Sequence, residues 1–212
     1  MQGLLNMKNR YKIAGSVAEI NSLYPDVHKY CAEYQTSEFA DYTVTVTQSD
    51  IDAEREYSLR ESQIEGISAP EYPDSYLEKL AVLRKMSDEL ISRNTLLFHV
   101  SAVSLDGDGY LFTAKSGTGK STHTRLWREY FGDRAVIVND DKPFLQISDE
   151  GVIVFGSPYG GNSAIRSRKS RTADIRQSVF RFFSGRRDRA GQYAAAKRRY
   201  SFANRRYNVS GL

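Results

Sequence analysis

A short run of small residues around one lysine constrains this chain more than any other feature of its sequence. The run occupies positions 114–121 and matches the phosphate-binding loop pattern, with alanine where glycine usually stands first. Small residues let the backbone curl so that successive N–H groups point at phosphate oxygens. The lysine offers a positive charge to the outer phosphates, and the final hydroxyl helps to hold Mg²⁺. The predicted nucleotide-binding residues are Ala114, Lys115, Ser116, Gly117, Thr118, Gly119, Lys120 and Ser121.

The sequence on either side of this loop has the order that a nucleotide site requires. Residues 110–113 form a compact apolar run after a turn-like Asp-Gly-Asp-Gly segment, which predicts a buried strand. Residues 122–131 contain no proline or glycine and are consistent with a helix. A helix that begins near Ser121 adds the positive end of its dipole to the same place. We therefore expect the chain to bind a nucleotide together with Mg²⁺.

Two adjacent carboxylates, Asp140 and Asp141, follow the apolar segment 135–138. A carboxylate at the end of such a strand is where phosphate-loop proteins place a second Mg²⁺ contact. The pair also permits a division of labour, with one carboxylate near the metal and the other acting on an acceptor hydroxyl. The alternative is a surface turn, because Asn-Asp-Asp is good turn chemistry.

The remaining pattern predicts an α+β fold with a mixed β-sheet. A long amphipathic helix is expected from residue 74 or 75 to about residue 93, with apolar side chains recurring every three or four positions. Residues 50–60 are charged and fit either an exposed helix or a strand edge. Strands are expected at 11–20, 42–47, 96–105, 110–113, 135–138, 143–147 and 152–155, with a hairpin turn at 148–151.

Four separate motifs together resemble the catalytic core of HPr kinase/phosphorylase, which is related to ATP-dependent phosphoenolpyruvate carboxykinase. They are Phe-His-Val-Ser-Ala-Val at 98–103, the loop at 114–121, Val-Asn-Asp-Asp at 138–141 and Gly-Ser-Pro-Tyr-Gly at 156–160. Residues 116–127 are most similar to the loop of small bacterial HPr-kinase-like proteins. The resemblance covers about residues 10–161 and implies a phosphate-loop core of this type with a small N-terminal α/β annex.

The resemblance implies a role for each matching residue. Lys120 contacts the β- and γ-phosphates, and Ser121 holds Mg²⁺. Asp140 is the catalytic acid/base that deprotonates an acceptor serine, while Asp141 assists the metal. His99 lies beside Asp140; the alternative for His99 is a hydrogen-bonded core histidine on a buried strand.

Two other histidines and one arginine are weaker candidates. His123 and Arg125 follow the loop, so they either approach the nucleotide or lie on a solvated helix face. His28 has no such context and is expected at the surface. The single cysteine, Cys31, excludes an intramolecular disulfide framework and a cysteine-based zinc site, and is expected to be a packing residue.

The composition divides the chain into an N-terminal annex (1–95), a nucleotide-binding core (96–161) and a basic tail (162–212). The tail holds twelve arginines and two lysines against two aspartates, whereas the whole chain carries only +4. Fourteen leucines precede position 162, and only Leu212 follows it. Three interpretations stay open: a nucleic-acid arm of arginines and aromatics, a solvated or disordered extension, or a shifted reading frame near Asn162.

Taken together, the sequence predicts an ATP-dependent phosphotransferase that acts on a serine or other hydroxyl of a protein or peptide. One alternative is a nucleotide-binding regulatory protein without turnover, which is a truncated kinase core if the frame is shifted. The other is a nucleic-acid-binding ATPase that uses the tail, although we do not expect a nucleic-acid partner. No stretch approaches the roughly 18–20 apolar residues that span a bilayer, so we expect a cytoplasmic protein with no membrane partner. A homo-oligomer is compatible with these expectations.

Overall fold

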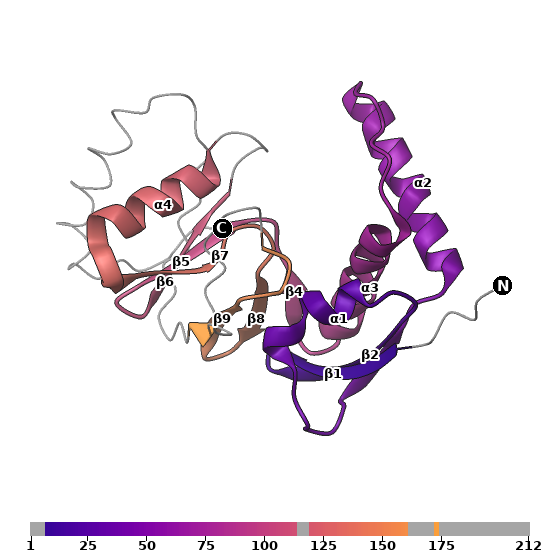
Figure 1. Cartoon of the computed structure of the whole chain (residues 1–212). Helices are drawn as coiled ribbons and strands as arrows, with labels where there is room; N and C mark the ends of the chain where they lie inside the picture. Colours follow the sequence, from indigo (N-terminus) through magenta and orange to yellow (C-terminus); the bar gives the residue numbers. More distant parts are fainter. Residues whose placement is uncertain (1–6, 114–118, 161–171, 174–212) are drawn as a thin grey trace.

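The computed structural model describes residues 7–113, 119–160 and 172–173, the last two by their backbone only. Helices combine with one mixed and two antiparallel sheets in this part of the chain, so the expected α+β fold is confirmed (Figure 1). Residues 114–118 of the loop, and all of the basic tail except residues 172–173, lie outside the described residues.

The N-terminal annex begins with an antiparallel hairpin of β1 (Met7–Ile13) and β2 (Ser16–Ser22). The sequence predicts one strand over 11–20, and this prediction is wrong. Ala14 and Gly15 take left-handed φ values of 53° and 77° and close a two-residue turn, the geometry that suits the twist of paired strands. The α1 helix (Asp26–Tyr30) and the 3₁₀ turn η1 (Ala32–Tyr34) follow, and β3 (Tyr42–Thr45) pairs parallel to β2.

Two 18-residue helices complete the annex, α2 (Gln48–Glu65) and α3 (Asp74–Ile91). A capping box starts α2: the Asp50 carboxylate accepts the backbone N–H of Thr47 at 2.8 Å. The charged region that fitted either a helix or a strand edge is therefore helical. The amphipathic helix expected from residue 74 is confirmed as α3, whose buried residues recur at helical spacing.

The other strands form two antiparallel sheets. In the first, β10 (Thr172–Ala173), β9 (Gly151–Phe155), β8 (Phe144–Ser148) and β4 (Thr95–Leu97) are neighbours in that order. In the second, β5 (Ser101–Leu105) lies between β6 (Asp108–Phe112) and β7 (Ala135–Asn139). The single strand predicted over 96–105 is thus wrong, because β4 and β5 join different sheets. The hairpin turn at 148–151 is confirmed.

The second sheet is covered on both faces. The α4 helix (Lys120–Phe131), followed by the 3₁₀ turn η2 (Gly132–Arg134), connects β6 to β7 and packs against one face (Figure 1). That interface comprises Val103, Leu105, Phe112, Ala135 and Ile137, with Tyr110, Trp127 and Phe131 against them. A second cluster of Val100, Ala102, Leu111, Val138, Leu145 and Val154 joins this sheet to β8 and β9.

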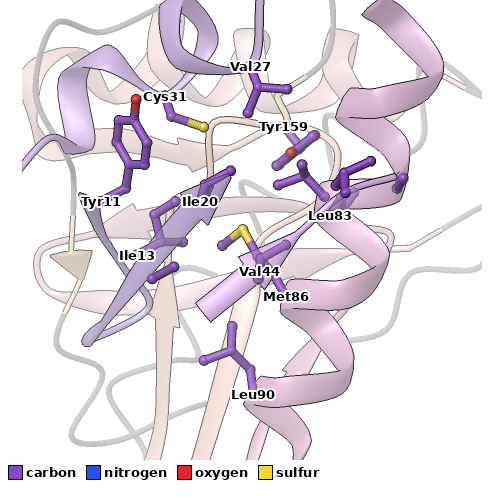
Figure 2. Close-up of a cluster of buried hydrophobic side chains, with 14 of the residues drawn as sticks. Tyr11, Ile13, Ile20, Val27, Cys31, Val44, Leu83, Met86, Leu90 and Tyr159 are labelled. Atoms are coloured by element: carbon purple, nitrogen blue, oxygen red, sulfur yellow. The ribbon is translucent and has the colours of Figure 1, made fainter. Parts of the chain in front are cut away.

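The largest core lies in the annex and extends beyond it (Figure 2). Side chains of β1, β2, β3 and α3 form most of it, and Phe144 and Tyr159 enter from the region after residue 95. Cys31 is wholly buried in this core, and burial raises the pKa of its thiol to about 12. The annex and the region that follows it therefore share apolar packing.

Candidate functional site

The register of the second sheet places two of the sequence motifs at the same edge. Since β6 and β7 are both antiparallel to β5, they run parallel to each other on either side of it. Phe112 at the end of β6 lies opposite Ser101, and Asn139 at the end of β7 lies opposite Ala102. Two segments therefore leave the sheet about two strand spacings, or about 10 Å, apart. One leads into the 114–121 loop, and the other carries the paired carboxylates.

The described end of the loop is the start of α4. Gly119 stands before the helix with φ 93° and ψ 26°, and Lys120 is the first helical residue. A helix start near Ser121 is thus confirmed, and the exposed Ser121 hydroxyl lies in its first turn. The first four N–H groups of a helix have no partner within it and carry partial positive charge. This end of α4 is suited to an anion. Positions 114–118, predicted to bind the nucleotide, lie outside the described residues.

Asn139 organises the carboxylate turn. Its side-chain Oδ1 accepts the backbone N–H groups of Asp141 and Lys142 at 2.9 and 2.8 Å. Its Nδ2 donates to the carbonyl and hydroxyl oxygens of Ser157, each at 3.2 Å. No role for Asn139 is predicted from the sequence, although the Asn-Asp-Asp turn chemistry is a signal that points to it. The same hydrogen bonds of Asn139 form the turn and hold the two carboxylates in place, so a turn at this position does not argue against a site.

The 156–160 motif packs directly on this turn. The Ser157 hydroxyl donates to the Lys142 carbonyl at 2.6 Å and accepts the Tyr159 N–H at 3.2 Å. A Cβ built at Gly160 would lie 3.2 Å from Oδ1 of Asp140. Two motifs separated by fifteen or more residues are therefore brought into contact by one serine, one asparagine and one glycine.

The two carboxylates have different surroundings. Asp140 is 9% exposed, and the Ser101 hydroxyl donates to its backbone carbonyl at 2.9 Å. Asp141 is more open, and its Oδ1 lies 3.0 Å from Nε2 of His99. His99 is exposed and belongs to the connection between β4 and β5, not to a buried strand. The observed carboxylate partner of His99 is thus Asp141, whereas the resemblance implied a place beside Asp140.

His123 and Arg125 take part in local contacts of α4. The His123 ring lies 4.7 Å from that of Phe112, and burial lowers the pKa of the imidazole. It also faces Trp127 at 6.3 Å, so it belongs to the packing of α4 on the sheet. Arg125 pairs with Glu129 one turn along the helix at 3.6 Å.

The expectation that His28 lies at the surface is wrong. Its Nδ1 is 2.7 Å from the Tyr11 hydroxyl, and its Nε2 is 3.0 Å from the Ser22 hydroxyl and 3.1 Å from the Met7 carbonyl. The ring is half-buried and joins α1 to the hairpin. The sequence offered no signal for this network, because its members come from three separate elements.

The fold and the site define an α+β protein with paired carboxylates at the sheet edge where β6 also ends, beside the first turn of α4. No family model matches this chain, and no curated protein matches it. None of the helices in the described ranges is long and apolar enough to cross a membrane. The functional assignment therefore depends on the residues of the site.

Proposed function

We propose that this protein is an ATP-dependent phosphotransferase that moves the γ-phosphoryl group of ATP to a serine or other hydroxyl of a protein or peptide. The observation that carries the proposal is the register of β6, β5 and β7, which places the end of β6 and the turn at Asp140 at one edge of the sheet. The first turn of α4 lies at the same end of β6, because the ring of His123 is 4.7 Å from that of Phe112. Phosphoryl transfer needs little more than positioning and charge stabilisation, and this edge offers groups for both.

Each residue of the site then has a defined task. Lys120 and the N–H groups at the start of α4 bind the phosphates of ATP. Asp140 accepts the proton of the acceptor hydroxyl, whose oxygen forms the new bond to the γ-phosphorus. The bond from that phosphorus to the bridging oxygen breaks in the same displacement, and ADP leaves with the electron pair.

The side chains expected to hold Mg²⁺ suit that ion chemically. Mg²⁺ takes oxygen ligands and is usually held by one or two protein groups plus phosphates and water, and Ser121 and Asp141 supply a hydroxyl and a carboxylate. No group of three or more histidine, cysteine or acidic side chains gathers within the described residues. Bound there, the ion would neutralise charge on the phosphates. His99, 3.0 Å from Asp141, would hold that carboxylate in place.

The proposal is tested with purified protein, γ-labelled ATP, Mg²⁺ and an array of serine-containing peptides. We expect label transfer by the native protein and its loss in both Lys120→Ala and Asp140→Asn. Only Lys120→Ala should also weaken ATP binding, because Asp140 acts on the acceptor. Arg125→Ala is the control, since it removes an exposed pair on the same helix and should keep native transfer.

Two other results would reject the proposal, each in favour of an alternative function, and a third would reject only the role of Asp140. ATP binding without transfer or hydrolysis indicates a regulatory protein. Hydrolysis that DNA stimulates, with a steep dependence on salt, indicates a nucleic-acid-binding ATPase. Transfer that survives Asp140→Asn at the native rate removes Asp140 from the mechanism.

A further inference from the structure

The α2 helix of the annex carries large apolar side chains on an exposed face. Ile64 is 80% exposed, Tyr57, seven residues before it, is 50% exposed, and Ile67, just beyond the helix end, is 57% exposed. Residues seven apart lie on the same face of a helix. None of the three belongs to the apolar clusters of the described residues. Figure 1 shows the C-terminal end of α2 extending beyond α3, away from the sheets.

A groove of about 320 Å³ lies beside this face, between α2 and α3. Ala53, Tyr57 and Arg60 belong to its α2 side, and their spacing of three and four residues continues to Ile64 on the same helix face. Ala81 belongs to its α3 side. The charged side chains that line the groove form three ion pairs: Arg84 with Glu54, Lys85 with Asp50 and Arg60 with Glu56. With these charges paired, the lining has no net charge to favour an ionic ligand, so the groove suits an apolar side chain.

The exposed isoleucine and the groove are complementary parts of one surface. In an antiparallel pairing of two α2 helices centred near residue 59, Ile64 of one copy lies opposite the stretch from Ala53 to Tyr57 of the other. Twofold symmetry repeats every contact, so each copy gives one isoleucine and receives one. A parallel pairing would instead set Arg60 opposite Arg60 and leave both grooves empty. A second, antiparallel copy of this chain therefore covers both features at once.

We propose that this protein forms a twofold-symmetric dimer through α2, in which Ile64 of each copy enters the groove between α2 and α3 of the other. The charges on this face favour a second copy as the occupant. Arg60 and Glu61 are adjacent, exposed and opposite in sign, so an antiparallel copy brings equal numbers of each to the twofold axis. A partner of one sign would meet a like charge at one of the two positions. The dimer does not depend on the proposed function, because none of these residues belongs to the candidate site.

The test measures the mass of the full chain in solution by sedimentation velocity and by light scattering. The native protein should have twice the mass of one chain at high micromolar concentration. Ile64→Lys replaces the side chain that enters the groove, and Ala53→Glu places a carboxylate in the groove itself. Both positions are exposed, so circular dichroism should show a native fold. Each variant should raise the dimer dissociation constant at least about tenfold, because it buries a charge without a partner.

Leu59→Lys is the matched control. Leu59 is 45% exposed and lies two residues from Tyr57, on the opposite side of the helix, so this variant should stay dimeric. Mixing the Ile64→Lys and Ala53→Glu proteins should restore dimers, since one native isoleucine then meets one native groove and the new lysine meets the new carboxylate. A monomeric native protein, a native dissociation constant in Ile64→Lys, or a mixture that stays monomeric would each overturn the inference and leave the proposed function standing.

Discussion

Replacing Tyr159 with phenylalanine should make the protein more stable, the opposite of what most substitutions do. The Tyr159 ring is buried in the annex core, and its hydroxyl has no hydrogen-bond partner within the described part of the chain. Burial also raises the pKa of this hydroxyl well above its ordinary value. Burying a hydroxyl without a partner costs about 1–3 kcal/mol in protein mutational data. Phenylalanine removes that cost and keeps the ring contact with Tyr30.

The expected gain in unfolding free energy is about 1–2 kcal/mol, the lower part of that range, because phenylalanine leaves a small void where the oxygen was. For a chain of this size, 1 kcal/mol shifts the melting temperature by roughly 2–4 °C. Thermal and urea unfolding followed by circular dichroism should thus show a rise of about 2–8 °C in Tyr159→Phe. Phosphoryl transfer should be unchanged, because the ring contact with Tyr30 and the hydrogen bond from the backbone N–H of residue 159 to Ser157 both remain.

Tyr11→Phe is the control for this experiment. Tyr11 is buried in the same core, but its hydroxyl is 2.7 Å from Nδ1 of His28. Removing that hydrogen bond should cost about 0.5–1.5 kcal/mol, so the two tyrosine variants should move in opposite directions. A Tyr159→Phe protein that melts below the native one, as Tyr11→Phe does, would show that the Tyr159 hydroxyl has a partner and would refute the reasoning.

Three further outcomes are expected. Leu90→Ala, at a wholly buried position of α3, should lower the unfolding free energy by about 2–5 kcal/mol in urea; a loss below about 1 kcal/mol would contradict the core described above. Gly119→Ala forces a residue with a Cβ to take a left-handed φ of 93°, which costs about 1–2 kcal/mol. Titration calorimetry should therefore show weaker ATP binding. Unchanged ATP affinity would show that the backbone at residue 119 does not contribute to nucleotide binding. Burial raises the pKa of the Glu78 carboxyl above 4.5, although the N–H groups of Leu23 and Tyr24 lower it. The stabilisation by protonated Glu78 is therefore complete below the pKa of the unfolded chain and is lost as the pH rises through the pKa of the folded protein. From about pH 4 upward, the melting temperature of the native protein should fall relative to that of Glu78→Gln. Melting temperatures of the two proteins that change in parallel with pH would contradict this.

Elements with a local cause could be predicted from the sequence. The α3 helix follows from its apolar spacing, and the 148–151 turn follows from a run of turn-forming residues between two apolar strands. The start of α4 follows from a glycine and a lysine after an apolar run. In each case the sequence pattern lies within the residues that form the helix or the turn, so the prediction requires no knowledge of a residue distant in sequence.

The wrong predictions concern residues whose partners in the structure are distant in sequence. The segments 11–20 and 96–105 each have strand character throughout, yet the first turns back at Gly15 and the second changes sheet between Leu97 and Ser101. Propensity reports that a residue suits a strand, not which strand it pairs with. The place of His28 was mistaken for the same reason, since its contacts come from β1 and β2.

At the candidate site, residue types could be predicted but their pairing could not. Asp140 and Asp141 look equivalent in sequence, and only the structure separates a nearly buried carboxylate from one beside His99. The structuring role of Asn139 was missed because its side chain joins the local turn to Ser157, which lies eighteen residues away. The two adjacent aspartates differ because of the residues that surround each of them in the structure, and the local sequence does not specify those residues.

The same long-range contacts link the annex to the proposed chemistry. Tyr159 belongs to the annex core, and the next residue, Gly160, packs closely against the Asp140 carboxylate. Loss of packing in the annex, as in Leu90→Ala, should therefore loosen position 160 as well as lower stability. Since nothing in this coupling touches Lys120, peptide transfer should decline before ATP binding as such a variant is warmed. An annex that only supported the fold would lose both together, so the order of the two losses distinguishes a structural annex from one that positions the acceptor side of the site.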